Sequence, residues 1–578
     1  MTNWQKRYQR WNNYKNLDTD LKQQLRDMQN DEAKIVDAFY TGLQFGTGGI
    51  RGILGAGSNR LNIYTIRQAV KGLSIYLEKN RVNVHDRGVV VAYDSRHMSK
   101  EFAIECAKVL GVHGIKTHIF EELRPTPLLS FAVRYLGTAA GIMITASHNP
   151  PEYNGFKVYN EAGSQISLDE ANEIIGNINE VKDELQVPVL TEKELIENNL
   201  LTWINGEVDN AYLEQLLKIS KMNEEKQLKK KDLEIVFTPL HGTALRLVQS
   251  GLAQLNFPHV HIVEEQAVPD PEFSTVELPN PEERQAFQKA IKLGNEVEAD
   301  ILLATDPDAD RLGVAVKDKD GTYVVLTGNQ LGCLLLDYIL SHSEAQMLKN
   351  ARMLKTIVTT ELGRAVASSY GVKTVDTLTG FKYIGEKINE YDATGETFIF
   401  GYEESYGYLI SSFARDKDAV QATVMACEMA QYWKDQGKTL LDALDELYEQ
   451  HGYYKEKLHS FTLEGQEGQA QIKSITDNMR ENDLQVVGNM KVKYKEDYLV
   501  GKRFFNDDNK VEEIHLPREN VIKYVLEDNC WLCVRPSGTE PKIKWYYGVR
   551  GNSEVEADEK LFQLEQSLKK LMDIPIAD

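Results

Sequence analysis

Short apolar runs alternate along the chain with longer stretches in which apolar residues recur at helical spacing. This alternation predicts an α/β fold, in which strands and helices follow one another. Many of the apolar runs end in polar, Gly-rich or Pro-rich segments, and these are the runs at residues 89–93, 142–144, 235–237, 301–304, 398–400 and 531–534. Because ligands of open α/β sheets bind beyond the carboxyl ends of strands, we expect the functional groups in the segments that follow.

The length of 578 residues exceeds what one hydrophobic core supports, so several domains are expected. The alternating pattern is interrupted at residues 180–206, near Gly321 and at residues 451–459. We therefore predict four domains, which span residues 1–205, 206–322, 323–453 and 454–578.

The composition restricts the environment and the partners of the protein. Hydrophobic residues make up 42% and charged residues 26%, as in soluble globular proteins. Runs of about 18 apolar residues are absent, so no membrane partner is expected. The polar N-terminus does not resemble a secretory signal, and five cysteines do not form a disulfide framework, so we expect a cytoplasmic protein. The formal net charge of −21 disfavours nucleic acid, and an anionic small ligand would need a local cluster of cations.

The first candidate site follows the run at residues 142–144, where the chain reads TASHNPP and then NGFK. It places Ser147 beside His148 directly after a buried strand, and Lys157 follows. The Gly-x-Ser-x-Gly elbow of hydrolases is absent, which disfavours acyl transfer. Taken alone, the segment is more typical of an ordinary loop, because Ser, Asn, Pro and Gly are common in turns.

The second candidate site is the segment DPDADR, which places carboxylates at the alternate positions Asp306, Asp308 and Asp310. Three such carboxylates can converge on one hard cation. An EF-hand is excluded because its required Gly and Glu are replaced by Arg311 and Lys317. The apolar residues on both sides argue against a solvated acidic turn, so the segment predicts a metal site.

The same segment resembles the haloacid-dehalogenase phosphotransferases locally. In that interpretation Asp306 is the nucleophile and Asp308 is the acid and base. That family normally continues with Gly and Thr, whereas this chain has Ala309 and Asp310. The departure disfavours this alternative.

A third candidate site is the segment RPSGTEPKIK near the C-terminus. Its arginine, hydroxyl groups and bare glycine backbone are suited to the oxygens of a phosphate dianion. The residues concerned are Arg535, Ser537, Gly538, Thr539 and Lys544.

Three shorter segments complete the candidate set. Glu403 and Ser405 in the segment GYEES suit the vicinal hydroxyls of a sugar. The segment GTGGIRG misses the dinucleotide fingerprint and the P-loop, and we interpret it as a flexible loop that presents Arg51 to an anion. A further loop, TGFKYIG, presents Lys382.

Together and in this order, these motifs resemble the α-D-phosphohexomutase superfamily, in particular its phosphoglucomutase branch of the phosphoglucomutase-2/phosphopentomutase type. The resemblance runs from about Gly46 to about Lys544. It implies three similar α/β domains with mixed sheets and a smaller C-terminal α+β domain, all around a central cleft. It also implies an intramolecular phosphotransferase, which is an isomerase, with small-molecule sugar phosphates as partners.

Residue roles follow from the resemblance. It assigns catalysis to Ser147, which bears the phosphoryl group, and to His148, Lys157, Arg51 and Lys382. It assigns substrate binding to Glu403, Ser405, Arg535, Ser537, Gly538, Thr539 and Lys544. It assigns Mg²⁺ to Asp306, Asp308, Asp310 and the phosphoserine oxygen of Ser147.

The implied reaction interconverts glucose 1-phosphate and glucose 6-phosphate, with glucose 1,6-bisphosphate as intermediate and activator, in a monomer or weak homodimer. Phosphomannomutase and phosphopentomutase remain alternatives: the Glu403-Glu404-Ser405 run resembles the glucose type, whereas Tyr402 resembles the pentomutase branch. A dehalogenase-type phosphosugar phosphatase is a further alternative. A non-catalytic binder is disfavoured because Ser147 and the aspartates are all present.

Overall fold

The computed structural model describes residues 2–46, 48–222, 227, 229–463, 465–508, 510–536 and 542–572. The chain divides into two compact units. The first consists of Met1–Leu331 and Phe381–Thr439, and the second of Gly332–Gly380 and Leu440–Asp578.

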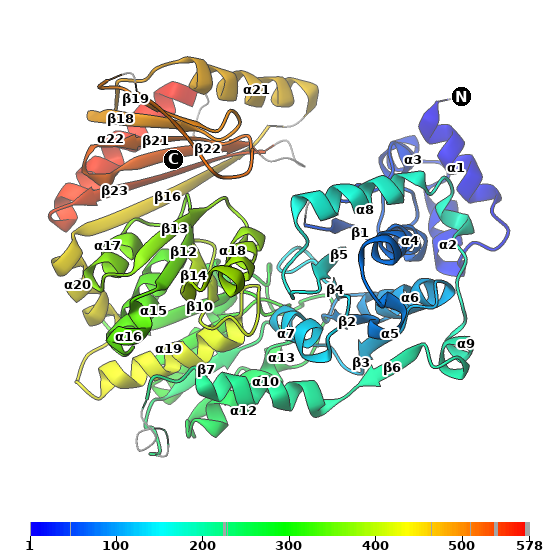
Figure 1. Ribbon diagram of the computed structural model, residues 1–578, viewed down its shortest axis with the longest axis horizontal. Coiled ribbons are helices and arrows are strands. Elements are labelled where there is room, and N and C mark those ends of the chain that lie inside the picture. The colour runs from blue at the N-terminus through cyan, green and yellow to red at the C-terminus, as the bar shows by residue number, and fades with distance from the viewer. Residues whose placement is uncertain are drawn as a thin grey trace. The chain divides into compact units, whose positions relative to one another are not determined.

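The N-terminal segment forms three helices, α1 (Asn3–Asn13), α2 (Thr19–Met28) and α3 (Glu32–Phe39) (Figure 1). Asp18 and Asp31 cap the second and third helices by accepting from backbone amides of the first turn. The helices share a small core around Trp11 and Phe39 with Ala56, Tyr64 and Leu185. The indole of Trp11 donates to Glu184, which ties this segment to the rest of the first unit.

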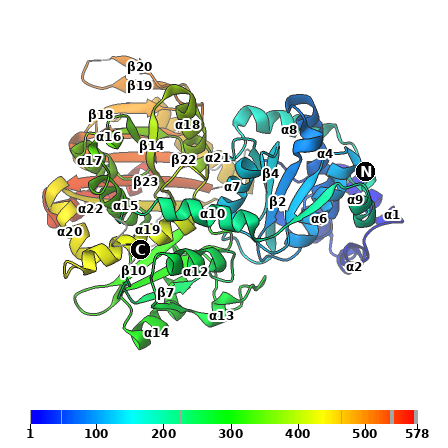
Figure 2. The ribbon, with the colours of Figure 1, turned by 60° about the horizontal axis from the view of Figure 1, so that its bottom comes forward.

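The first sheet of the first unit has six strands in the order β1-β5-β4-β2-β3-β6. β1 and β5 are antiparallel to their neighbours, and the other pairs are parallel. Its strands are β1 (Ile50–Ile53), β2 (Val89–Tyr93), β3 (Thr117–Phe120), β4 (Ala140–Ile144), β5 (Tyr153–Asn160) and β6 (Leu201–Ile204). Its helices are α4 (Ile63–Asn80), α5 (Val84–Arg87), α6 (Ser99–Val112), α7 (Thr126–Leu136), α8 (Leu168–Glu180) and α9 (Glu192–Glu197). Figure 2 shows β2 and β4 side by side between α6 and α7, so both faces of the sheet are covered.

The second sheet of this unit has the order β11-β10-β9-β7-β8 and is also mixed. Its strands are β7 (Ile235–Thr238), β8 (Val260–Ile262), β9 (Ile301–Thr305), β10 (Leu312–Lys317) and β11 (Tyr323–Val325). The helices of this part are α10 (Gly206–Lys218), α12 (Leu245–Gln254), α13 (Glu264–Ala267) and α14 (Gln288–Val297). The unit is completed by α18 (Phe381–Thr394), the antiparallel pair β14 (Thr397–Glu403) and β15 (Gly407–Leu409), and α19 (Ala419–Lys434).

The second unit contains a parallel strand pair and a larger antiparallel sheet. The parallel strands are β12 (Ala351–Thr356) and β13 (Lys373–Thr377). The helices of this part are α16 (Ala345–Leu348), α17 (Leu362–Ser369) and α20 (Leu440–His451). The chain passes from the first unit into the second within α15 (Gly328–Ser341). The antiparallel sheet runs β16-β23-β22-β21-β18-β19-β20, with β17 on β18. Its strands are β16 (Tyr453–Thr462), β17 (Val486–Val487), β18 (Met490–Asp497), β19 (Lys502–Phe505), β20 (Val511–Glu513), β21 (Ile522–Leu526), β22 (Trp531–Pro536) and β23 (Lys542–Gly551). Helices α21 (Gly465–Glu481) and α22 (Glu554–Met572) share one core with it, which gives an α+β layer.

The predicted fold class is confirmed: the α/β parts have mixed sheets, and a smaller α+β part follows at the C-terminus. Each of the six apolar runs is a strand or part of one. Two local predictions are wrong. Arg51 lies in β1, because that segment pairs with β5, and Lys382 lies in the first turn of α18 rather than in a loop.

Candidate active site

Ser147 lies in the loop that follows the fully buried strand β4. Its backbone has φ = 53°, a left-handed conformation that a non-glycine residue adopts at a cost of about 1–3 kcal/mol. The hydroxyl of Thr145 accepts from the Ser147 amide at 2.8 Å and thereby supports this turn. The residue is 3% exposed, so the loop presents the serine to the protein interior rather than to bulk solvent.

The Ser147 hydroxyl is directed at the aspartate segment that follows β9. Its Oγ donates to Asp306 Oδ2 at 2.7 Å and lies 3.1 Å from His148 Nδ1. The other carboxylate oxygen of Asp306 accepts from the amides of Asp310 and Arg311 at 3.0 and 2.9 Å. The serine segment and the aspartate segment therefore meet at the serine hydroxyl.

The three aspartates form a cluster that is suited to a hard cation. Asp306, Asp308 and Asp310 are buried, and each offers an oxygen within 4.8 Å of the others. Asp308 Oδ1 and Asp310 Oδ1 are buried and accept no hydrogen bond. Buried carboxylate oxygens without a partner are costly unless a cation or proton satisfies them, so the donor set fits a metal that prefers oxygen ligands.

Two lysines lie against the cluster. Lys157 of β5 donates to Asp308 Oδ2 at 2.8 Å and lies 3.6 Å from Asp310 Oδ2. Lys417 lies 3.0 Å from Asp310 Oδ2 and 3.3 Å from Asp416 Oδ1. Burial alone would lower both lysine pKa values, but the facing carboxylates outweigh it and raise them. Both lysines are therefore cationic at neutral pH.

The ionisation of the neighbouring groups follows the same balance. Burial raises the pKa of Asp306 well above its usual range, and the carboxylates of Asp308 and Asp310 raise it further. Burial opposes ionisation of Asp308 as well, but the ammonium group of Lys157 together with hydrogen bonds, including the one from Thr126, outweighs burial and lowers that pKa. Burial and then the cation of Arg311 hold the pKa of His148 well below its usual range, so the imidazole beside Ser147 Oγ is neutral at pH 7.

Several other predicted residues approach the same centre. Glu403 ends β14, is 5% exposed, and acts electrostatically on Lys417. Ser405 follows it in the turn between β14 and β15. Arg51 donates to Asn149 Oδ1 in the serine loop at 2.9 Å.

The start of α18 also belongs to this region. The ring of Phe381 lies 5.6 Å from Lys417 Nζ, and Lys382 is the next residue along the helix. The ammonium group of Lys382 lies 4.8 Å from the ring centroid of Tyr383.

The predicted phosphate-binding residues belong to the second unit. Arg535 lies in β22 opposite Lys544 of β23, and its guanidinium donates to Glu519 at 3.3 Å. Ser537, Gly538 and Thr539 fall outside the described residues.

Sequence reasoning missed two residues that touch the aspartates. Thr126, at the start of α7, donates to Asp308 Oδ2 at 2.9 Å, and an isolated threonine gives no signal of such a contact. Lys417 lies in the charged run RDKD before α19, which resembles a solvated turn in the sequence. The structure buries the whole run, and that burial makes it part of the site.

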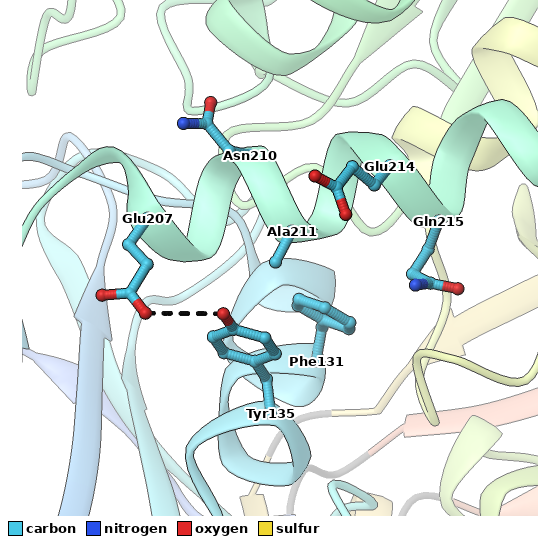
Figure 3. A pocket seen from close by; sticks show the side chains of 7 residues that line it. All are labelled: Phe131, Tyr135, Glu207, Asn210, Ala211, Glu214 and Gln215. Atoms are coloured by element: carbon cyan, nitrogen blue, oxygen red, sulfur yellow. Dashed lines mark hydrogen bonds between the residues drawn. The ribbon is translucent and has the colours of Figure 1, made fainter.

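A separate hollow of about 360 Å³ lies between α7 and α10 (Figure 3). Its wall includes the stacked rings of Phe131 and Tyr135 and the carboxylates of Glu207 and Glu214, and the Tyr135 hydroxyl donates to Glu207 at 3.4 Å. None of the predicted site residues lines it. Because its charged groups are acidic, it is not suited to an anionic substrate.

No helix among the described residues has the length and apolar character that crossing a bilayer requires.

The chain matches four consecutive parts of one family description, "Phosphoglucomutase/phosphomannomutase": alpha/beta/alpha domain I at residues 42–185, domain II at 210–321, domain III at 327–451 and the C-terminal domain at 484–561.

Relatives of known name extend this match over nearly the whole chain. A phosphoglucomutase of Staphylococcus haemolyticus (strain JCSC1435) is 40% identical over 524 residues, which cover 91% of this chain and 93% of that protein. A phosphoglucomutase of Staphylococcus aureus (strain bovine RF122 / ET3-1) is 42% identical over 89% of this chain and 91% of its own length. The solved structure of the Paramecium phosphoglucomutase parafusin shares the fold, with a TM-score of 0.66 at 17% identity over 92% of this chain and 95% of that one. The chain therefore belongs to the phosphoglucomutase/phosphomannomutase family.

Proposed function

We propose that this chain is a phosphoglucomutase that interconverts glucose 1-phosphate and glucose 6-phosphate through a phosphoserine at Ser147. The observation that carries the proposal is the 2.7 Å hydrogen bond from Ser147 Oγ to Asp306 inside a buried cluster of three aspartates. A serine ester beside a bound cation can store a phosphoryl group and pass it to a sugar hydroxyl without water as the acceptor. Relatives at about 40% identity bear the name phosphoglucomutase.

In the proposed cycle, phospho-Ser147 transfers its phosphoryl group to O6 of glucose 1-phosphate. The P–O bond to Ser147 breaks as the P–O bond to O6 forms, the proton of the O6 hydroxyl ends on the released Ser147 Oγ, and the product is glucose 1,6-bisphosphate. The bisphosphate then reverses its orientation in the site, so that O1 faces Ser147. Ser147 Oγ accepts the phosphoryl group from O1, and glucose 6-phosphate remains. This second transfer regenerates the serine ester. The same transfer from free bisphosphate can prime enzyme that has lost its phosphate.

The residues around Ser147 support this cycle in distinct ways. The neutral imidazole of His148, 3.1 Å from Ser147 Oγ, can accept the serine proton when Oγ attacks phosphorus. Lys157 and Lys417 remain cationic and offset the charge on the transferring oxygens. Arg51 and Lys382 supply further positive charge, and Glu403 with Ser405 can bind sugar hydroxyls.

Asp306, Asp308 and Asp310, together with the phosphoserine oxygen, would hold Mg²⁺. When bound, this cation supplies Lewis-acid stabilisation of the phosphoryl oxygens. Arg535, Ser537, Gly538, Thr539 and Lys544 would hold the phosphate that does not react.

The sugar is proposed to be glucose rather than a pentose. Tyr402, the residue that resembles the pentomutase branch, is fully buried and its ring packs 5.4 Å from that of Phe400. We therefore attribute Tyr402 to the packing of β14, and the name phosphoglucomutase that the relatives bear favours glucose.

The test combines intact-protein mass with an activity assay. Purified protein, charged with glucose 1,6-bisphosphate, is expected to gain the mass of one phosphoryl group, and peptide mapping should assign it to Ser147. With Mg²⁺ and a trace of the bisphosphate, the enzyme should convert glucose 1-phosphate to glucose 6-phosphate faster than it converts mannose 1-phosphate or ribose 1-phosphate.

Ser147→Ala should abolish both the charging and the mutase activity. An alanine variant that remains active, together with an uncharged Ser147 in the wild type, would contradict the proposal and direct attention to Asp306 as the nucleophile. A preference for mannose 1-phosphate or ribose 1-phosphate would retain the chemistry and change the sugar.

A further inference from the structure

Arg96 is a buried arginine whose guanidinium faces the inside of the serine loop. Its Nη1 donates to the carbonyls of Pro150 and Tyr153 at 2.8 and 3.0 Å. Its Nη2 donates to the Ser147 carbonyl at 2.7 Å and to the Asn149 carbonyl. Four backbone carbonyls on the two arms of one loop therefore converge on a single side chain.

The guanidinium is itself held from two other directions. Its Nε lies 3.4 Å from Asp94 Oδ2, and both side chains of this ion pair are fully buried. The ring of Phe273, which belongs to the part of the unit that follows β8, lies 4.9 Å from the guanidinium carbon. The carboxylate compensates the buried charge, and the aromatic ring attracts the guanidinium that lies over it.

The same anchor reaches the far arm of the loop. Asp94 accepts from Ser99 Oγ at 2.8 Å, and Ser99 Oγ in turn accepts from the side chain of Asn154 at 2.9 Å. The Asn154 side-chain carbonyl accepts from the Gly155 amide in β5 at 2.7 Å. The network thus spans the segment from Ser147 to the strand that carries Lys157.

We propose that Arg96, which lies over the ring of Phe273, is the positioning residue that holds the left-handed Ser147 conformation and so aims Oγ at the aspartate cluster. Arg96 does not itself contact the reacting atoms. Its role, which rests on the proposed function, is to fix the loop backbone by donating to four of its carbonyls at once.

A planar fork of donors is required for this role. Lysine retains the charge but offers one nitrogen, which cannot serve carbonyls on both arms of the loop at once. Arg96→Lys should therefore keep the charge balance with Asp94 while it loosens the backbone of Ser147. A misplacement of the reacting oxygen of about 1 Å is expected to reduce the rate about 100-fold.

The experiment measures kcat and KM with glucose 1-phosphate, and by intact mass the rate at which glucose 1,6-bisphosphate charges Ser147. In Arg96→Lys we expect kcat and the charging rate to fall about 100-fold while KM stays close to the wild-type value. Inorganic phosphate released per turnover should rise, because a misaligned phosphoserine is exposed to attack by water. Phe273→Leu, which retains the four donors and removes the ring, should show the same pattern with a smaller fall in kcat.

Arg67→Lys is the matched control. Arg67 also lies over an aromatic ring, with its guanidinium 5.3 Å from the centroid of Tyr64, and donates to the carboxylate of Glu105 at 2.6 Å, but it holds helices rather than the serine loop. If Arg96→Lys and Phe273→Leu lose no more kcat than Arg67→Lys, the positioning role is overturned. If Arg96→Lys fails to fold, as judged by circular dichroism, Phe273→Leu alone decides. Wild-type protein that never charges Ser147 would instead overturn the proposed function.

Discussion

At the scale of single residues, Thr126 is the clearest case of a side chain that acts through another. Its hydroxyl donates to Asp308 Oδ2, and its amide donates to the Asp308 carbonyl, both at 2.9 Å. Thr126→Val removes only the hydroxyl contact. Because a partner of a metal-binding carboxylate typically contributes 10–100-fold to metal affinity, the Mg²⁺ concentration for half-maximal activity should rise by about that factor.

Thr138→Val is the control for this prediction. Thr138 is equally buried, and its hydroxyl donates to the Ala140 carbonyl rather than to an aspartate. Its Mg²⁺ titration should coincide with that of the wild type. Coincident titrations for both valine variants would show that Thr126 does not tune the cluster.

Asp418 should make the stability of the protein depend on pH. Burial raises the pKa of this carboxyl from 3.8 to about 6, although it accepts from Tyr212 and caps α19. The folded state therefore binds a proton more tightly than the unfolded state. The stabilisation that this protonation provides is complete below pH 3.8 and is lost as the pH rises through about 6.

Asp418→Asn removes this titration while it retains one oxygen for the helix cap. Relative to the wild type, the variant should gain about 2–3 kcal/mol of unfolding free energy between pH 4 and pH 7. Urea unfolding of both proteins at several pH values measures the difference. A difference that stays constant over this interval would show that Asp418 does not titrate there.

At the scale of elements, the loop after β7 supports the aspartate segment, the proposed metal site, by close backbone contact. A Cβ placed on Gly242 would lie 2.4 Å from Pro307 Cα, and the amide of Thr243 donates to the Pro307 carbonyl at 2.9 Å. Gly242→Ala must therefore displace the backbone between Asp306 and Asp308. We expect a loss of about 1–3 kcal/mol in unfolding free energy and weaker activation by Mg²⁺.

Gly176→Ala is the matched substitution. Gly176 lies inside α8, and a Cβ there would meet nothing within 4 Å. Alanine should be neutral or stabilise the protein by up to about 1 kcal/mol, because it favours the helix. Equal melting temperatures for the two variants would argue against the close contact at Pro307.

Elements were predictable wherever the local pattern and the tertiary environment agree. The apolar runs that form β2 and β9 are buried along their whole length, so their hydrophobicity reports their position directly. The segment around Arg51 has no such pattern, since β1 is a strand only because β5 lies beside it. Lys382 was misplaced because its loop-like TGFK context conceals the start of α18.

The candidate site was predictable where its chemistry is concentrated in one short segment. Alternate aspartates between apolar residues indicate a cation site, and the fold brings Asp306, Asp308 and Asp310 together. Arg96 and Lys417 gave no such signal, because a charged residue in a polar turn is usually solvated. Their burial depends on segments distant in the chain, such as the loop at Phe273 for Arg96.

At the scale of the whole molecule, the division into two units has a consequence for metal binding. Ser147, the three aspartates and both lysines that contact them all lie in the first unit. A ligand that binds only the folded form of one unit stabilises that unit, by about 2.7 kcal/mol at a concentration 100 times its dissociation constant. Mg²⁺ should therefore slow amide hydrogen exchange in β9 and β10 and leave exchange in β18 and β21 unchanged.

Hydrogen exchange read by mass spectrometry with and without Mg²⁺ tests this expectation peptide by peptide, because a melting temperature of the whole chain does not separate the two units. The Asp310→Asn variant is the control, since it removes one carboxylate of the cluster and should abolish the protection of β9. Equal protection of β9 and β18 would mean that the two units open together, and protection that survives in Asp310→Asn would place the cation elsewhere. Protection confined to the first unit would instead show that the cation organises the proposed phosphoryl-transfer centre. It would also show that the second unit, which contains the predicted phosphate-binding residues, is stabilised by its own core and not by the cation.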